Sequence, residues 1–496
     1  MLDTQVELRA LPVKLWNAGR HLIFGTNPCP ISKLSPEVLG EIFLWCLPTD
    51  GFQSTLDPPR LSLEPLTLSH VSSRWRTVSL STPSLWSTIW VDRPQDAHIS
   101  MVELWLERSR TSPLTLYLRQ TAALVAGQQS FAHPFEFDLT DEILIVLAMH
   151  LDRWRRVTFL LYHGTQMGLL DIPQSADAAP LLEHVQLSVK QWDVRDGEEM
   201  ERIMYSLPSV KSVVIHPYMS QNFVQWENLT VLDAKQLPCT INNYLHVLRH
   251  CSVLQQADIR CTYDGETRYV PPPPHGRLRL PRLSSFTVHA DRVDLRPLFD
   301  NLILTSLQGL VLRYFNAPRR SDDPQALARL LTYSACVLRR FSLRDAAQTP
   351  NDDHILAFLA LPQMAGLNEL YLQTALSDKI TSFLTFPDVD DEPALRPLAN
   401  LHTISLLDLQ GEHLEDLVLY RMVVSRLTPA STRVLRAAFF SLRLKGHAGS
   451  AVLPWLVERC RERIDLRIYL AQCEDPAAKV GWYASAPIPG GYLTDE

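Results

Sequence analysis

Glycine is scarce in this sequence, and so are patterned cysteines and long apolar runs. Only 18 of the 496 residues are glycine, which argues against collagen-like chains and glycine-rich nucleotide-binding folds. The 8 cysteines form no C-x-x-C pair, so we expect no zinc ribbon or thioredoxin-type site. No run reaches the ~18 apolar residues of a membrane helix, and the first residues lack the pattern of a secretory signal. We therefore expect reduced thiols and a location in the cytoplasm or nucleus.

The overall charge and the absence of catalytic motifs narrow the function further. A net charge of −7 provides no general attraction for nucleic acid or for an anionic membrane. The sequence contains no P-loop, G-x-S-x-G, H-E-x-x-H or kinase signature. His246 and His250 lie one helical turn apart before Cys251, but no second ligand pair follows, so we expect surface or half-buried histidines rather than a metal site. We therefore expect a non-catalytic protein without a cofactor.

Residues 30–92 are predicted to form a small helical module. Residues 34–48 fit one short helix that Ser35 caps and that Pro36 begins. Its apolar face contains Val38, Leu39, Ile42, Phe43 and Cys46. After a loop at 49–65, residues 66–81 are predicted to form a second helix. Its apolar stripe contains Leu68, Val71, Trp75 and Val78. Thr82 is the expected cap of a third helix, with Trp86 as a buried anchor; three such short helices bury little surface unaided.

These residues resemble the F-box in the form common among fungal F-box-like proteins. The matching residues are Leu34, Pro36, Glu37, Val38, Leu39, Ile42, Phe43, Leu47 and Pro48, then Leu68, Ser69, Val71, Arg74, Trp75 and Arg76, and finally Ser81, Thr82, Pro83, Leu85 and Trp86. The resemblance covers about 60 residues and implies binding to a Skp-family adaptor and, through it, to a cullin. The adaptor-binding residues that it implies are Leu34, Pro36, Val38, Ile42, Phe43, Leu47, Leu68 and Val71.

Leucine is the commonest residue, and from Trp154 onward an L-x-x-L-x-L spacing recurs ten times. The triplets are Trp154-Val157-Phe159, Leu182-Val185-Leu187, Val210-Val213-Ile215, Leu229-Leu232-Ala234, Leu254-Ala257-Ile259, Leu283-Phe286-Val288, Leu307-Leu310-Leu312, Leu338-Phe341-Leu343, Leu367-Leu370-Leu372 and Leu401-Ile404-Leu406. The mean interval of about 27 residues is typical of leucine-rich repeats. We therefore expect an α/β solenoid with parallel strands on a concave face and the second and third triplet members in the core. Chance spacing in a leucine-rich chain is the alternative.

The expected organisation has six parts. Within the repeats, the helices that return from one strand to the next are clearest at 242–251 and 323–338. The parts are an extension (1–29), the F-box-like module (30–92), a connector and N-terminal cap (93–153), degenerate repeats (154–427), a C-terminal repeat or cap with a helical stretch at 453–470 (428–475), and a loose tail (476–496). We expect a strand at 113–118 and a helix at 139–151. The proline run at 270–282 reads as a stiff loop or a ligand for a proline-reading domain, and the acidic segment 385–397 as a solvated loop.

One position of the repeat carries basic side chains. The residue after the last apolar member is expected on the concave face because side chains alternate along a strand. The residues at this position are Ser188, His216, Lys235, Arg260, His289, Arg313, Arg344 and Gln373. We expect the six basic members to form a ladder that binds an acidic or phosphorylated target, with little local acid to neutralise it. Solvated strand ends are the alternative.

The expected function is therefore substrate recognition in a cullin-type (SCF) ubiquitin ligase, in which partner enzymes perform the chemistry. A non-ligase scaffold, in which the helical module only caps the solenoid, is the alternative. A hydrolase or transferase with an unrecognised site is a third reading.

Overall fold

The structure, a computed structural model, describes most of the chain between residues 30 and 484. The described residues are 30–47, 64–120, 124–125, 128–129, 134–161, 178–189, 194–216, 223–263, 276–315, 322–345, 352–386, 398–408, 414–427, 435–442, 456, 464–470 and 482–484. The expected loop at 49–63, the proline run at 270–275 and the acidic segment 387–397 lie outside them. The chain divides into two compact units. One comprises residues up to Trp90 together with Ser100–Leu114, and the other comprises Val91–Ile99 and the rest.

Helices make up most of the described residues of the first unit, which we call the helical unit. The helices up to Trp86 are η1 (Pro30–Lys33), α2 (Pro36–Trp45), α3 (Glu64–Val71), α4 (Ser73–Ser81) and η2 (Pro83–Trp86). The elements β1 (Thr88–Asp92) and α5 (Asp96–Ser109) each cross a boundary between the two units. The Ser35 hydroxyl caps α2 by accepting a hydrogen bond from the Val38 amide, as predicted.

The single helix predicted at 66–81 is wrong. Two helices occupy this stretch, because the Ser72 hydroxyl accepts from the Trp75 amide and starts a new helix at Ser73. Val71 is consequently exposed rather than part of a buried stripe. Thr82 does not cap the 3-10 helix that follows, since its hydroxyl donates to the Val78 carbonyl. Trp86 is fully buried, as predicted.

A 15-stranded sheet runs through the second unit, with its strands following each other in chain order. After β1 they are β2 (Leu114–Arg119), β5 (Trp154–Leu161), β6 (His184–Val189), β7 (Ser212–Val214), β8 (Val231–Cys239), β9 (Gln256–Thr262), β11 (Ser285–Asp291), β13 (Gly309–Phe315), β14 (Arg340–Asp345), β15 (Glu369–Thr374), β16 (Thr403–Asp408), β17 (Ala437–Leu442), β18 (Asp465–Leu470) and β19 (Trp482–Ala484). Each neighbouring pair from β5 to β18 is parallel, and β19 is antiparallel to β18.

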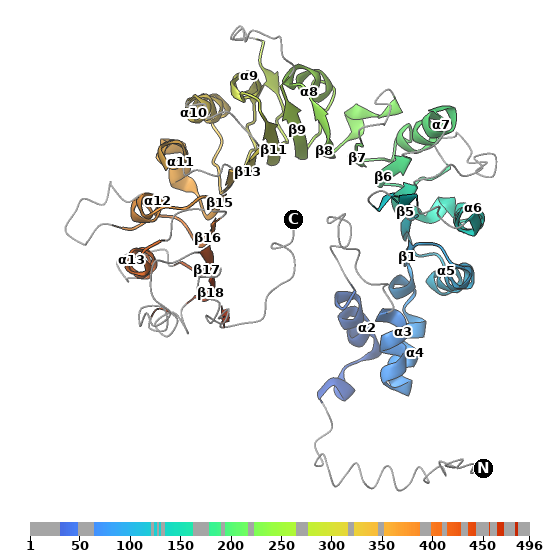
Figure 1. The fold of residues 1–496 in the computed structure, drawn as a ribbon. Helices are drawn as coiled ribbons and strands as arrows, with labels where there is room; N and C mark the ends of the chain where they lie inside the picture. The colour runs from blue at the N-terminus through green and yellow to red at the C-terminus, as the bar shows by residue number, and fades with distance from the viewer. Residues whose placement is uncertain are drawn as a thin grey trace, which may run out of the picture. The chain divides into compact units, whose positions relative to one another are not determined.

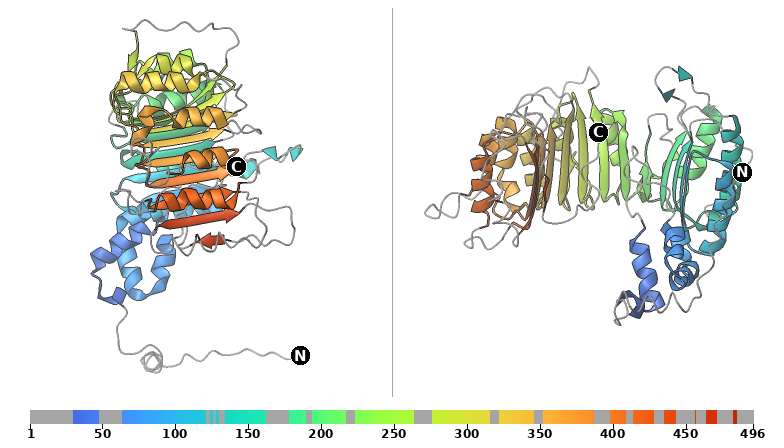
Figure 2. Two further views of the ribbon diagram at one scale, coloured as in Figure 1. Left: turned by 90° about the vertical axis from the view of Figure 1, so that its left-hand side faces the viewer. Right: turned by 60° about the horizontal axis from the view of Figure 1, so that its bottom comes forward.

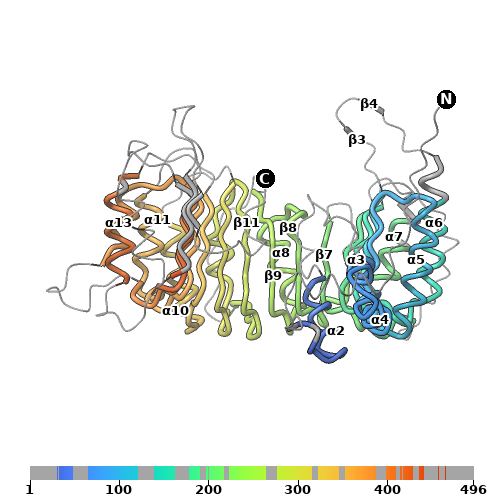
Figure 3. Tube along the Cα trace, turned by 90° about the horizontal axis from the view of Figure 1, so that it is seen from below, coloured from blue at the N-terminus to red at the C-terminus, as the bar shows by residue number. Residues whose placement is uncertain are grey.

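Helices connect many of the strands and cover one face of the sheet. They are α6 (Pro134–Ala148), α7 (Val194–Tyr205), α8 (Ile241–Leu248), α9 (Arg296–Asp300), α10 (Asp323–Ser334), α11 (Asp352–Leu359), α12 (Asp378–Phe383) and α13 (Asp416–Ser425). Figure 1 shows these helices on the outer side of the curved sheet, and Figure 2 shows the strands stacked beneath them. Figure 3 shows the successive turns of the second unit from α6 to α13. The fold is thus a repeat-like α/β arrangement, and we call the face opposite the helices the concave face.

The triplets are confirmed as the core of this sheet. All thirty residues are at most 4% exposed. Their second members align across ten strands, from Val157 through Leu310 to Ile404. Leu435, Ala438 and Phe440 continue the pattern within residues 428–475, where a C-terminal repeat or cap was expected, and Ala438 and Phe440 lie in β17.

Several predicted boundaries and one predicted element change. The strand at 113–118 and the helix at 139–151 are present as β2 and α6, although α6 begins at Pro134. The predicted returns are α8 and α10, which both end earlier than expected. The helix at 453–470 is wrong in its last part, because Asp465–Leu470 alternates apolar and polar residues and forms β18. Within the tail expected to be loose, Trp482–Ala484 forms β19.

Candidate functional site

Helix α2 carries two apolar stripes, one buried and one exposed. Leu39 and Phe43 are fully buried in the helical unit. Val38, Ile42 and Trp45 are 47%, 38% and 83% exposed. These three residues are spaced by four and three positions, so they share one side of the helix. We call them the exposed stripe of α2; exposed apolar clusters of this kind are typical of interaction surfaces.

The buried stripe holds α2 against α4. The rings of Phe43 and Trp75 lie 4.8 Å apart between their centroids, and Arg74 donates a hydrogen bond to the Leu34 carbonyl. A Cβ placed on Gly40 would come 3.2 Å from the Thr82 hydroxyl oxygen, so the contact leaves little room for a larger residue. The exposed stripe is therefore presented by a helix whose other side is fixed.

The eight predicted adaptor-binding residues divide into three groups. Pro36, Val38, Ile42 and Val71 are exposed, and Leu34 and Leu47 are half-buried. Phe43 and Leu68 are buried, at 0% and 8% exposure, which corrects their assignment as contact residues. The sequence pattern placed Val38 and Phe43 on one face because both stripes are apolar. It also missed Trp45, whose spacing from Val38 and Ile42 could have identified it.

The basic row on the concave face is confirmed over its central part. Arg260, His289, Arg313, Arg344 and Gln373 are aligned as successive partners on β9, β11, β13, β14 and β15. Apart from His289, each of these side chains is half-buried. Five neighbouring strands therefore present nitrogen donors at one level of the sheet, which we call the basic row.

Two predicted members do not belong to this row as expected. The register between β8 and β9 shifts between Ala234 and Pro238, so Lys235 has no aligned partner in β9. His216 follows the end of β7 and is only 6% exposed. The predicted ladder of six is consequently shorter than the sequence indicated.

The prediction of little neighbouring acid is wrong. Arg260 donates a hydrogen bond to Asp291 at 2.9 Å, and His289 Nε2 lies 2.8 Å from Asp258 Oδ1. Lys235 also forms an ion pair with Asp233 at 3.4 Å. The sequence showed these carboxylates but not their side-chain directions. The N-terminal part of the row therefore combines both signs of charge.

Aromatic packing further restricts His289. Its ring stacks on Phe315 with centroids 5.8 Å apart and planes 1° apart, and its side chain is 8% exposed. The Arg260 guanidinium lies 5.9 Å from the same Phe315 ring. His289 is thus packed between neighbours and less accessible to a protein partner than the prediction required.

The raised pKa values of two buried tyrosines, Tyr205 and Tyr244, come from their packing in the array. Burial raises the pKa of Tyr205 and Tyr244, whose hydroxyls lie among backbone groups of the strands. Tyr205 accepts from the Leu187 amide at 3.1 Å, and Tyr244 donates to the Leu237 carbonyl at 2.5 Å. These hydroxyls support strand ends.

Within the described residues, no group of three histidine, cysteine or acidic side chains could hold a metal ion.

No family model and no curated protein matches this sequence. Among the described helices, none has the length and apolar character needed to cross a lipid bilayer. The described residues thus offer two candidate binding surfaces, the exposed stripe of α2 and the basic row.

Proposed function

We propose that this chain is a substrate-recognition subunit of a cullin-type ubiquitin ligase. In this proposal the helical unit is F-box-like and binds a Skp-family adaptor, and the repeat-like unit, a degenerate leucine-rich-repeat array, holds a target protein. The chain supplies proximity and orientation, while partner enzymes transfer ubiquitin.

The exposed stripe of α2 is the observation that carries this proposal. Trp45 is 83% exposed although tryptophan is a large apolar residue, and Val38 and Ile42 lie on the same side of the helix. Val71, at the end of α3, adds another apolar side chain at 58% exposure. Aromatic and aliphatic side chains of this kind bury well in a protein interface. A partner that covers them would supply the burial that a small helical module lacks.

A cytosolic or nuclear location belongs to the same proposal. The cysteines in the described part of the chain form no disulfide; they are Cys46, Cys239, Cys251, Cys261 and Cys336. Free thiols are the usual state in reducing compartments, where cullin-type ligases would act.

Adaptor capture by the purified full chain tests the proposal. We expect Val38→Ala combined with Ile42→Ala to lower capture of a recombinant Skp-family adaptor at least about tenfold, because interface anchors carry much of the binding energy. Val337→Ala combined with Leu417→Ala is the matched control, since these aliphatic residues are also exposed, at 63% and 45%, but lie outside the helical unit.

Two results would decide against the proposal. The first is absence of adaptor capture by the wild-type chain, which would favour the non-ligase scaffold. The second is equal capture by the stripe variant and the control variant with both melting temperatures unchanged, which would move the interface away from α2.

A further inference from the structure

Two cysteines are partners on neighbouring strands of the sheet. Cys239 is the last residue of β8 and is aligned with Cys261 of β9 in a parallel register. Both are thiols in this structure, and their strands lie side by side (Figure 1). Adjacent strands are ~4.8 Å apart, which is within the range of Cα separations that a disulfide spans. The backbone therefore places this pair at a distance that a disulfide bond can bridge.

Both side chains lie on the helix side of the sheet. Ile259 is a core residue of β9, and Cys261, two residues further on, is also fully buried. Burial is the main cause of the raised pKa of the Tyr244 hydroxyl on α8, and Cys239 and Cys261 both raise it further. Burial likewise raises the pKa of Cys261, and Cys239 raises it further. Such mutual effects require closely placed groups, so both sulfur atoms lie near the Tyr244 hydroxyl and near each other.

The two thiols differ in their access to solvent. Cys239 is half-buried, whereas Cys261 is fully buried. Because burial also raises the pKa of Cys261, its thiol stays protonated and reacts slowly with dissolved reagents. Cys239 is therefore the sulfur that an oxidant in solution would meet first.

The pair lies where the pairing of β8 with β9 is irregular. The register shifts between Ala234 and Pro238, and two aligned positions follow the shift, Pro238 with Arg260 and Cys239 with Cys261. Proline has no amide hydrogen, so Pro238 cannot donate to the neighbouring strand. A covalent bond at Cys239 would therefore hold a stretch of β8 whose regular pairing is interrupted.

We propose that Cys239 and Cys261 are a redox-sensitive pair that closes to a disulfide when the chain meets a small-molecule disulfide such as oxidised glutathione. The thiolate of Cys239 attacks one sulfur atom of the oxidant and forms a mixed disulfide, and one glutathione thiolate leaves. The thiol of Cys261 then loses its proton to water, its sulfur attacks the Cys239 sulfur, and the second glutathione thiolate leaves. The two cysteines together lose two electrons, and the oxidant is reduced to two thiols.

The disulfide would join β8 to β9 and stiffen one turn of the array. Arg260, the first residue of the basic row, directly precedes Cys261 in β9. Oxidation would thus fix the backbone at one end of the basic row, and reduction would release it. This regulation goes beyond the proposed function and does not depend on adaptor binding.

Equilibration of the purified full chain with equal concentrations of reduced and oxidised glutathione tests the pair. The remaining thiols are then blocked with N-ethylmaleimide, and the chain is digested with trypsin without reductant. Cleavage after lysine and arginine puts three cysteines into three peptides, 236–249 for Cys239, 250–260 for Cys251 and 261–268 for Cys261. We expect peptides 236–249 and 261–268 to be linked in most chains, and dithiothreitol should separate them.

Single variants test the order of the two steps. Cys261→Ser should stop at a glutathione adduct on Cys239, whereas Cys239→Ser should leave Cys261 unmodified because that thiol is buried. Cys251→Ser is the matched control, since Cys251 is also fully buried and lies between the other two in sequence. This variant should keep the link between peptides 236–249 and 261–268.

Thermal unfolding shows whether the bond fits the folded chain. The oxidised wild-type chain should melt at least about 2 °C above the reduced chain, because the cross-link restricts the unfolded state. Cys261→Ser should show no such rise under the same conditions.

Four results would overturn the proposal. The first three are thiols that stay unmodified, a glutathione adduct on Cys239 of the wild-type chain without the link, and a link through Cys251. The fourth is a cross-linked chain that melts below the reduced chain, because closing the bond would then distort the pair. None of these results bears on adaptor capture by the helical unit.

Discussion

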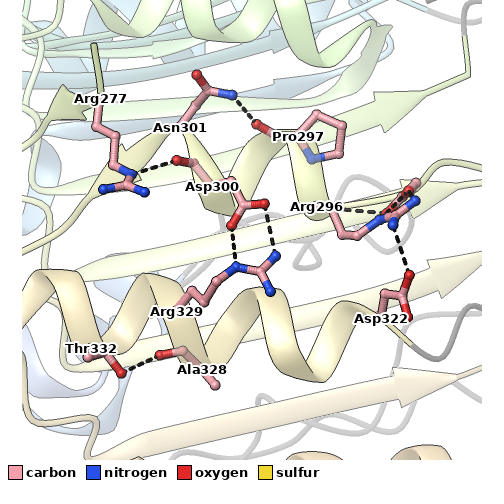
Figure 4. Close-up of polar contacts among 10 residues, drawn as sticks. Arg277, Arg296, Pro297, Asp300, Asn301, Asp322, Ala328, Arg329 and Thr332 are labelled. Carbon is pink, nitrogen blue, oxygen red and sulfur yellow. Dashed lines mark hydrogen bonds and ion pairs between the residues drawn. The ribbon is translucent and has the colours of Figure 1, made fainter. Parts of the chain in front are cut away.

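Arg329 on α10 holds the carboxylate of Asp300, at the end of α9, through two hydrogen bonds of 2.8 and 2.9 Å (Figure 4). Arg277 donates to the Asp300 backbone carbonyl at 2.9 Å and places its guanidinium 3.8 Å from the Tyr333 ring centroid. The contacts link successive helical returns, because α9 and α10 belong to neighbouring turns of the array. Asp300 is 7% exposed, so its carboxylate depends on Arg329 for hydrogen bonds.

The first prediction concerns this link. Arg329→Met keeps much of the aliphatic stem but removes both bonds, and we expect it to lower the free energy of unfolding by about 1–2 kcal/mol. Asp300→Asn with Arg329→Met should cost less than the sum of the two single changes, as chemical denaturation of the four proteins will measure. Arg339→Met, at an exposed position before β14, is the control. Strict additivity would contradict an energetic coupling between the two residues.

Burial of an acidic group predicts a pH dependence of stability. Asp323, at the start of α10, is 3% exposed, and burial raises its pKa from 3.8 to about 7. Asp294 raises it further, while the Tyr314 hydroxyl, which donates to Asp323 at 3.0 Å, lowers it. Arg296 bonds Asp294 and Asp322 beside it. The folded chain thus holds this proton more tightly than the unfolded chain.

The sign of the effect follows from linkage. A raised folded-state pKa gives stability that is fully present below pH 4 and is lost as the pH rises through about 7. Other groups add their own pH dependence, so the contribution of Asp323 is the difference between wild type and Asp323→Asn. Between pH 5 and 8 the melting temperature of wild type should fall relative to that of Asp323→Asn. Asp353→Asn on α11, at an exposed position, should follow wild type. If the melting temperatures of wild type and Asp323→Asn changed in parallel with pH, Asp323 would not be a source of the pH dependence.

The core of the sheet was predictable, and its exceptions have physical causes. Burial of a repeated apolar triplet determines where strands lie, so Leu310 and Leu312 could be placed from spacing alone. In α2, the apolar spacing could not distinguish the buried Phe43 from the exposed Ile42, because both stripes of the helix are apolar. Nor could it show that Asp258 approaches His289, since that contact depends on side-chain directions in strands far apart in sequence. Pro238 was an unused signal, because proline inside a strand often marks an irregularity.

Two neighbours on β13 test the register of the whole array. Leu312 is fully buried, whereas Val311, the next residue along, lies on the concave face and is half-buried. We expect Leu312→Asp to cost at least ~3 kcal/mol, because it removes apolar burial and places a carboxylate in the core. Val311→Asp should cost far less. Thermal unfolding gives the comparison, and hydrogen exchange should show the Leu312→Asp damage spreading to β11 and β14. Similar losses of stability in both variants would contradict this register.

The last prediction concerns the irregular end of β8. Tyr244 on α8 is 3% exposed and lies between two strands. Its hydroxyl donates to the Leu237 carbonyl of β8 at 2.5 Å and accepts from the Arg260 amide of β9 at 3.3 Å. The register shift between Ala234 and Pro238 occurs at the same place. The Tyr244 hydroxyl therefore bonds a β8 carbonyl and a β9 amide at the point where the regular pairing of the two strands is interrupted.

Tyr244→Phe should consequently weaken β8 more than its small change in volume suggests. We expect a loss of about 1–3 kcal/mol, since the Leu237 carbonyl and the Arg260 amide would lose a buried partner. Hydrogen exchange of residues 235–239 and 260–262 should quicken, while that of β13 to β15 stays unchanged. Tyr333→Phe, at a tyrosine that is 48% exposed, is the control because its ring contact with Arg277 is retained. If the β8 amides of Tyr244→Phe exchanged no faster than those of Tyr333→Phe, the irregularity would be held by the backbone itself. The displacement of Lys235 from the basic row would then have to be attributed to Pro238 instead of to the Tyr244 hydroxyl.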